Sequence, residues 1–370
     1  MSYESTAEPI KLGYLMDFKL PEGYPEESRQ DLVLPFELVF KQGLEKRLID
    51  RPVEMVFKEV EGLPKGSCKA VIDAFGELVD EGCIAVFGPH ITDNCVPMRE
   101  AIEKRFQVPA LSVTGSEDWL GEWTFALSQG SMTDEPIFWA DLLARGGHTE
   151  VGVLVEQSLV GESYVRNFHK ASADRGLRIV AEEWIPQTAQ AITDQVQALF
   201  DAQVSAFVHC GFGFGLLNVN SVLARMGWDP PRFLGTAFQN AWIHQILWDA
   251  IRGWTGVDQY DEANPVGQGF LDQYQETYGR RPEYCVPVVN RDMATVLLHA
   301  FSDAHPLSPR GVKEALERVK MVPAASGAPG TRLSFGKWTR RGWVGAGYLV
   351  ARQLDEEFGK SHRVGRFGEV

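Results

Sequence analysis

Hydroxyl-bearing side chains lie in two loops that follow apolar runs in the first third of the chain. Thr92 comes shortly after one run, and Thr114 and Ser116 come directly after the next, which itself contains Ser112. Hydroxyl groups in such loops can donate hydrogen bonds to an amide or carboxylate oxygen of a small ligand. The same residue types also cap helices and form turns, which is their commoner use. We interpret these four residues as candidate ligand contacts, with the turn-forming alternative open.

Apolar and aromatic side chains dominate the corresponding loops of the second half. Phe212 and Phe214 fit a ligand wall and a hydrophobic core equally well. Trp119 and Trp123, in the first half, fit either a core or a rim, and we expect the rim for Trp119. Hydroxyls in one half and aromatic groups in the other suit a partly apolar ligand whose polar end is fixed by a few hydrogen bonds. The candidate apolar contacts are Trp119, Val160, Phe212, Phe214, Ala237 and Phe238.

Sequence motifs of catalysis and of cofactor binding are absent. There is no G-x-S-x-G nucleophile elbow and no Walker A loop. The glycine-rich stretch Gly211–Gly215 departs from the G-x-G-x-x-G dinucleotide fingerprint and comes too late for a first βα turn. The five cysteines and eight histidines are scattered without the spacing of a metal site. We therefore expect no catalytic residue, no cofactor and no metal, although carboxylates from distant segments could still meet in an α/β enzyme.

Length and charge narrow the class of protein. The 370 residues exceed one ordinary core and favour two α/β domains. The net charge of −14, without a long run of lysine or arginine, argues against nucleic acid as a direct partner. No stretch approaches about 20 uninterrupted apolar residues, so we expect no membrane span.

Short apolar runs alternate with amphipathic segments along most of the chain, a pattern typical of parallel α/β sheets. We expect two open sheets of similar build, with a C-terminal third that completes both lobes. A late strand pair is expected from 332–335 and 347–351. The predicted strands of the first sheet are 10–16, 53–60, 84–88 and 110–113, and those of the second are 151–156, 179–185, 206–210 and 233–236.

Five segments, in this order and spacing, resemble the type I periplasmic binding proteins, in the branch of the leucine/isoleucine/valine-binding protein and the cytoplasmic amide sensor of amidase operons. They are Ile10–Gly13, Ala85–Pro89 leading to Thr92, Val108–Ser112, Tyr278–Pro282 and Gly330–Phe335. The resemblance implies two flavodoxin-like lobes with parallel sheets, joined by three crossovers, that close by a hinge motion around a ligand in the cleft. It implies an N-terminal lobe of 1–125 plus 255–330 and a C-terminal lobe of 126–254 plus 331–370.

The resemblance also assigns roles to single residues. Thr92 matches the family hydroxyl that holds the polar head of the ligand, and Thr114 and Ser116 match the pair after the fourth strand. Val160 stands where the family usually has a tyrosine, and Ala237 falls near the acidic residue that amino-acid binders use for the ligand ammonium. Because burying an ammonium without a carboxylate partner is costly, we expect a neutral or anionic ligand, such as an amide or an aromatic acid.

The function implied is that of a non-catalytic receptor for a partly apolar amide, carboxylate or amino-acid-like solute, serving an ABC uptake system. A cytoplasmic sensor that regulates an amidase-type or catabolic operon is the first alternative, an α/β enzyme the second, and a scaffold with a vestigial cleft the third. The partners expected are a small molecule and either an ABC permease or a regulatory protein, with a homodimer left open.

The start of the chain and its cysteines bear on location. The first nine residues are acidic and lack the basic, apolar and small-residue regions of a secretory signal. The five cysteines show no disulfide pattern, so we expect buried or half-buried free thiols and a reducing compartment. We therefore expect a cytoplasmic protein, with a periplasmic or extracellular one whose leader was removed as the alternative.

Overall fold

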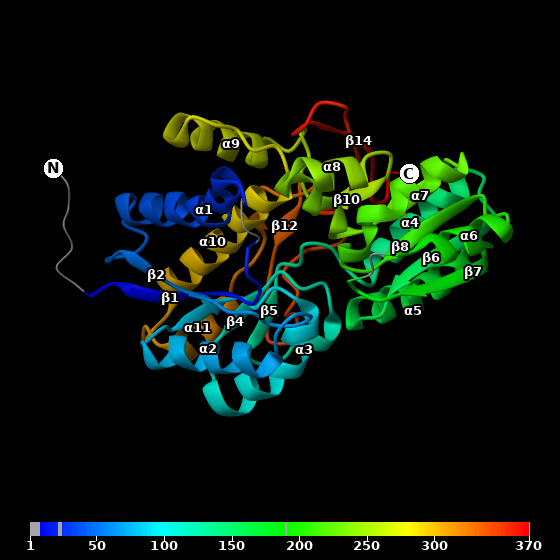
Figure 1. Cartoon of the computed structure of the whole chain (residues 1–370). Coiled ribbons are helices and arrows are strands. Elements are labelled where there is room, and N and C mark those ends of the chain that lie inside the picture. Colours follow the sequence, from blue (N-terminus) through cyan, green and yellow to red (C-terminus); the bar gives the residue numbers. More distant parts are fainter. Residues whose placement is uncertain (1–7, 21–23, 189–190, 370) are drawn as a thin grey trace. The chain divides into compact units, whose positions relative to one another are not determined.

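The structure, a computed structural model, describes residues 8–20, 24–188 and 191–369 (Figure 1). It divides into two compact units, each built from segments that are distant in sequence. Unit 1 comprises Met1–Ser128, Glu262–Pro282 and Val286–Gly345, and unit 2 comprises Gln129–Asp261, Glu283–Cys285 and Ala346–Val370.

Four segments fall in the opposite unit from the sequence-based division into 1–125 plus 255–330 and 126–254 plus 331–370. Residues 331–345 and 126–128 lie in unit 1, and residues 255–261 and 283–285 lie in unit 2. Backbone hydrogen bonds explain the first placement, because Gly342 donates to the carbonyl of Ala126 and the Ala126 amide donates to the carbonyl of Arg340.

The sheet of unit 1 is parallel throughout, with the strand order β2-β1-β3-β4-β5. The carboxyl ends of its strands therefore lie along one edge, where open parallel sheets bind ligands. The predicted first strand is confirmed, whereas β5 was not predicted. The strands are β1 (Ile10–Met16), β2 (Val53–Glu59), β3 (Ala85–Phe87), β4 (Ala110–Ser112) and β5 (Thr124–Ala126).

Helices of unit 1 bury one face each against this sheet or against one another. In α2 (Cys68–Asp80), the buried residues Val71, Ala74, Phe75 and Leu78 follow helical spacing. Ser67 caps α2, as its Oγ accepts a hydrogen bond from the Ala70 amide. The other elements are α1 (Glu26–Glu45), α3 (Thr92–Ala101), the π-helical η1 (Ile102–Phe106), η2 (Glu117–Trp119), α9 (Pro265–Tyr278), α10 (Cys285–Asp303), α11 (Pro309–Leu316), β11 (Val322–Pro323) and β12 (Arg332–Leu333).

Unit 2 contains a parallel sheet of order β7-β6-β8-β9 and an antiparallel sheet of order β10-β13-β14. The parallel strands are β6 (Glu150–Glu156), β7 (Arg178–Ile185), β8 (Ala206–Cys210) and β9 (Arg232–Leu234), and the antiparallel strands are β10 (Gly256–Asp258), β13 (Val350–Leu354) and β14 (Ser361–Arg366). The helices are α4 (Asp134–Arg145), α5 (Leu159–Asp174), α6 (Thr193–Asp201), η3 (Phe214–Asn218), α7 (Val219–Met226), η4 (Thr236–Ile243) and α8 (Gln245–Ile251).

The late strand pair predicted from 332–335 and 347–351 is wrong. The β12 strand pairs with β11 in unit 1, and β13 pairs with β10 and β14 in unit 2. The two segments belong to different units because the chain passes from one to the other after Gly345.

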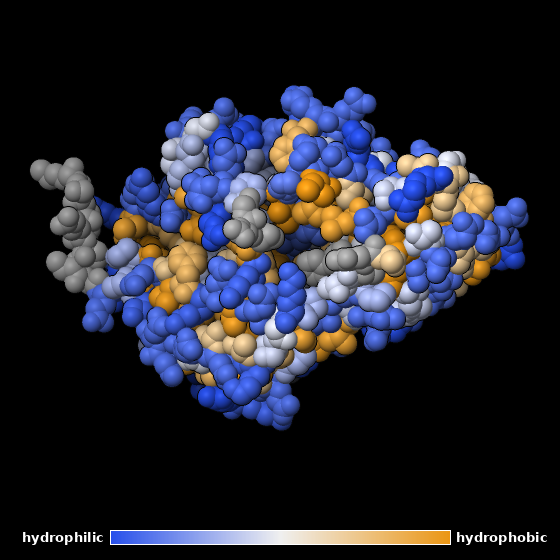
Figure 2. Space-filling view, viewed as in Figure 1, coloured by the Kyte–Doolittle hydropathy of each residue, from blue (hydrophilic) through white to orange (hydrophobic). Residues whose placement is uncertain are grey.

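The cysteine side chains are mostly buried, and the face seen in Figure 2 is mainly hydrophilic. Cys68 is half-buried, and the other four, Cys83, Cys95, Cys210 and Cys285, are buried. Among the described residues, no helix combines the length and the apolar character needed to cross a membrane. The face seen in Figure 2 is mainly hydrophilic, with apolar residues in smaller groups.

Candidate ligand-binding site

Asp17 organises the loop that follows β3. It comes directly after β1, and its buried carboxylate accepts hydrogen bonds from the amides of His90 (2.7 Å) and Ile91 (3.0 Å) and from Nδ2 of Asn94 (2.8 Å). These contacts fix the backbone just before Thr92, the first residue of α3. The sequence reasoning missed Asp17, although a single acid directly after the apolar run of β1 was a usable signal.

Three buried residues with hydroxyl groups follow the carboxyl ends of β3 and β4, and we call Thr92, Thr114 and Ser116 the hydroxyl cluster. Oγ1 of Thr92 lies 2.7 Å from Oγ1 of Thr114, which also accepts the Ser116 amide at 3.3 Å. All three residues are buried, and Oγ of Ser116 accepts the Asp118 amide at the start of η2. The hydrogen bond between the two threonines uses one of their two hydroxyl protons. The other hydroxyl proton can be donated to a ligand.

Ser112 supports this cluster from below. Its fully buried hydroxyl donates to the carbonyl of Pro89 at 2.6 Å and accepts the amide of Thr114 at 3.0 Å. It thereby ties the loop after β3 to the loop after β4. Its hydroxyl proton is used inside unit 1, so Ser112 positions its neighbours.

In unit 2 the glycine-rich stretch Gly211–Gly215 wraps a carboxylate of its own chain. Glu156, the last residue of β6, accepts the amides of Phe212 (2.7 Å), Gly213 (3.0 Å) and Gly215 (3.1 Å). A Cβ atom at Gly211 would lie 2.5 Å from the Glu156 carboxyl group, so that group needs the glycine. The amides that could have cradled a phosphate are therefore already occupied.

A second buried carboxylate lies beside β9, and we call Glu135, Tyr164 and Thr236 the carboxylate–tyrosine cluster. The Tyr164 hydroxyl donates to Oε2 of Glu135, and the Thr236 hydroxyl donates to Oε1 at 2.7 Å. Ser158 caps α5 by accepting the Gly161 amide. Within this helix, Val160 and Tyr164 lie one turn apart. Val160 is buried where the resemblance implied a tyrosine, and the tyrosine of this helix comes four residues later.

Burial controls the protonation of this cluster. It raises the pKa of the Glu135 carboxyl group to about 7, with the hydrogen bonds from Tyr164 and Thr236 acting in the opposite direction. Burial also raises the pKa of the Tyr164 hydroxyl, which stays a donor. A Cβ atom at Gly235 would lie 2.7 Å from Oε2 of Glu135, so the backbone closes tightly over the carboxyl group.

The comparisons with known proteins fit two α/β units with polar clusters at their strand ends. A family model described as periplasmic binding protein matches residues 9–346, most of the chain. The chain belongs to the periplasmic binding protein family. No protein matched in a search of curated sequences.

Solved structures share the type I fold of this family. A type 1 periplasmic binding protein from Bordetella pertussis superposes with a TM-score of 0.79 at 18% identity, covering 96% of this chain and 99% of that one. A leucine binding protein from Thermotoga maritima gives 0.78 at 13% identity, with 96% and 98% covered. A branched-chain amino acid ABC transporter protein from Thermus thermophilus, solved with bound valine, gives 0.76 at 15% identity, with 97% and 96% covered. The expected fold class, two lobes with parallel sheets, is thus confirmed.

In this periplasmic binding protein, Trp119 does not lie at a rim, so that expectation is wrong. Its side chain is fully buried in the core of unit 1 with Cys95, Met98 and Ile102. The indole Nε1 donates to the carbonyl of Phe125 at 2.8 Å. The η2 turn folds the indole inward because a buried acceptor is available there for its only polar group.

The apolar residues of unit 2 differ in their exposure. Phe238 is fully buried and packs edge-on against Trp242, with ring centroids 5.2 Å apart. Ala237 is buried next to Gly213. Phe212 is half-buried, and the Asn240 side chain donates to its carbonyl. The side chain of Phe214 lies outside the described part of the structure.

The structure brings together Thr92, Ser112, Thr114 and Ser116 in unit 1, as their shared strand-end placement predicts. Glu135 and Tyr164 escaped the sequence reasoning, because their helices α4 and α5 meet only in the folded unit. Within the described residues, no group of three or more histidine, cysteine or acidic side chains is arranged to hold a metal ion.

Proposed function

We propose that this chain is a non-catalytic receptor for a small, partly apolar solute, with the hydroxyl cluster fixing the polar end. The observation that carries the proposal is the buried pair of Thr92 and Thr114, whose oxygens lie 2.7 Å apart at the carboxyl edge of a parallel sheet. One hydroxyl proton of this pair has no acceptor in the pair, so an amide or carboxylate oxygen would complete it.

The proposed ligand class rests on the two acids near the ends of β6 and β9. A zwitterionic amino acid brings an ammonium group, which needs a carboxylate when it is buried. The two buried acids near the ends of β6 and β9 use their oxygens inside unit 2: Glu156 for three backbone amides and Glu135 for two hydroxyls. Both favour a neutral or anionic ligand over a free amino acid, although solved relatives include one with bound valine and one in complex with leucine.

The role proposed is that of the substrate-binding component of an ABC uptake system, acting in the periplasm or outside the cell. Family membership supports it, and so do relatives described as ABC transporter proteins. On this proposal the units close around the ligand by a hinge motion, which small-angle scattering would register as a smaller radius of gyration on saturation.

A cytoplasmic ligand sensor is the second candidate. Its supporting observation is the set of five free thiols, four of them buried, a state that reducing compartments maintain. Binding to an ABC permease would support the uptake role, and binding to a regulatory protein would support the sensor role.

Native mass spectrometry of gently purified protein tests the receptor proposal. We expect a small molecule to travel with the protein, to be recovered unchanged after incubation, and to raise the stability of the stripped protein when added back. At a hundredfold excess over its Kd, the ligand should add about 2.7 kcal/mol to the free energy of unfolding. Conversion of the bound compound would favour an enzyme, and stability indifferent to every recovered compound would favour a scaffold.

A further inference from the structure

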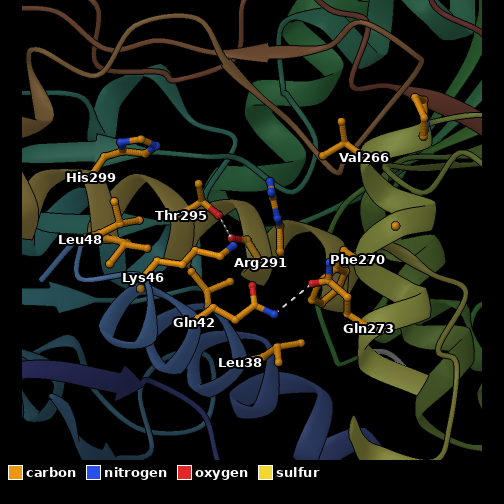
Figure 3. A pocket seen from close by; sticks show the side chains of 15 residues that line it. Leu38, Gln42, Lys46, Leu48, Val266, Phe270, Gln273, Arg291, Thr295 and His299 are labelled. Atoms are coloured by element: carbon orange, nitrogen blue, oxygen red, sulfur yellow. Dashed lines mark hydrogen bonds between the residues drawn. The ribbon is translucent and has the colours of Figure 1, made fainter. Parts of the chain in front are cut away.

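A groove lies within unit 1, among the helices α1, α9 and α10, away from the hydroxyl cluster (Figure 3). Its volume is about 370 Å³, at the lower end of the range of small-molecule pockets, roughly 300–1,000 Å³. None of the candidate ligand contacts lines it. The groove is therefore a separate feature of the molecule, and a role for it is independent of the receptor function proposed above.

Two glycines inside helices line the groove, and they differ in whether a side chain would clash with neighbouring atoms. A Cβ atom at Gly43 in α1 would lie 2.5 Å from Leu298, so close packing of α1 on α10 requires this glycine. A Cβ atom at Gly269 in α9 would meet no atom within 4 Å. Glycine inside a helix costs about 1 kcal/mol relative to alanine, and at Gly269 no neighbour requires it. The missing side chain leaves the hollow open.

The chemistry of the groove is that of an amphiphile site. Its floor is made of buried apolar side chains, among them Leu38, Phe270 and Leu298. Around the same hollow lie Lys46, Arg291 and His299 (Figure 3). No aspartate or glutamate is among the lining residues, although the chain as a whole carries a net charge of −14.

Arg291 is held in place by groups outside the groove. Nη1 of Arg291 donates to Oδ1 of Asp292 (2.8 Å) and to the carbonyl of Pro323 (3.2 Å), which fixes the guanidinium and leaves its other nitrogens for a ligand. Across the groove, the Gln42 side chain donates to Oε1 of Gln273 at 3.0 Å and links α1 to α9. Polar donors and a cationic edge over an apolar floor complement an anion with an apolar body.

We propose that this groove is a second small-molecule site, for an organic anion with a short apolar body, of the chemistry of a medium-chain carboxylate. The carboxylate would lie at Arg291 and Lys46, and the hydrocarbon would cover Leu38, Phe270 and Leu298 and occupy the space beside Gly269. Burying the apolar body contributes on the order of 0.8 kcal/mol per methylene, and the cationic edge selects the charged head group.

Calorimetry with sodium octanoate tests this site in the full-length protein. Gly269→Leu adds a side chain where a Cβ atom meets no neighbour, and it should weaken octanoate binding about tenfold or more, equivalent to about 1.4 kcal/mol. Thr277→Leu adds a leucine to the exposed face of the same helix and should leave binding unchanged. Lys46→Gln should weaken octanoate about two- to fivefold, as expected for an exposed charge, but not 1-octanol, whereas Lys104→Gln on η1 should affect neither.

A further variant separates this groove from the site of the hydroxyl cluster. Thr92→Ala with Ser116→Ala should leave octanoate affinity unchanged, in contrast to Gly269→Leu. The proposal is overturned when octanoate fails to bind at millimolar concentration, or binds the wild type and Gly269→Leu with equal affinity. It is also overturned when only the hydroxyl-cluster variant loses binding, because octanoate then occupies the other site.

Discussion

At the scale of single residues, each oxygen of the hydroxyl cluster has a defined partner within unit 1. Thr114 accepts the Ser116 amide, and Ser112 holds the Thr114 backbone to Pro89. Such an arrangement lowers the cost of ordering side chains during binding.

Replacing Thr92 and Ser116 together by alanine should weaken the binding of whichever amide or carboxylate binds the wild type. Two hydrogen bonds contribute about 1–3 kcal/mol in total, which is roughly 5- to 150-fold in Kd. Calorimetry on the variant gives the value, with Thr277→Ala on an exposed helix face as the control. Equal affinity of the double variant and the wild type would refute the role of the cluster.

Glu135 should make stability depend on pH. Burial raises its pKa from the ordinary 4.5 to about 7, so the folded state holds a proton that the unfolded state releases above its own pKa. This contribution to the free energy of unfolding is complete below about pH 4.5 and is lost as the pH rises through about 7.

Urea unfolding of the wild type and of Glu135→Gln at about pH 5 and about pH 8 measures this effect. The wild type should lose stability relative to the variant between the two conditions. Glu276→Gln, on the exposed face of α9, serves as the control. A constant difference between wild type and Glu135→Gln across this range would show that Glu135 titrates alike in both states.

At the scale of elements, apolar runs in the sequence predicted the bounds of several strands well. Features that depend on contacts between distant parts of the sequence were predicted poorly. The strands at 10–16 and 206–210 have the predicted bounds. By contrast, Trp119 turned inward, and the late strand pair was wrong, because both depend on partners far away in the sequence. The glycine-rich stretch 211–215 was correctly excluded as a dinucleotide loop, but its purpose became visible only with Glu156 in place.

Glycine-to-alanine substitutions should separate the loop that wraps Glu156 from an open helix position. Gly211→Ala places a Cβ atom 2.5 Å from the buried carboxyl group and should lower the free energy of unfolding by about 1–3 kcal/mol. Gly269→Ala meets no neighbour and should raise it by about 0.4–1 kcal/mol. Urea denaturation of both variants gives the comparison, and similar losses in the two would contradict the cradle at Glu156.

At the scale of the whole molecule, five thiols report on folding and location. Cys68 is half-buried and the other four cysteines are buried, and burial raises the pKa values of the Cys95 and Cys210 thiols. Burial also raises the pKa of the Cys68 thiol, so access to the reagent decides which thiol reacts. Only the half-buried Cys68 should react in the native protein, and all five should react after denaturation without reductant. Fewer than five thiols in freshly isolated, denatured protein would show disulfides and favour an oxidising compartment.

Calorimetry on ligand-free protein, with short amides, aromatic carboxylates and the twenty standard amino acids, tests the central claim most directly. The acids Glu135 and Glu156 are engaged within unit 2, so the account predicts binding of a compound from the first two classes. That binding should weaken in the Thr92→Ala, Ser116→Ala variant. Micromolar binding of leucine or another zwitterion, with no response to amides or carboxylates, would contradict it.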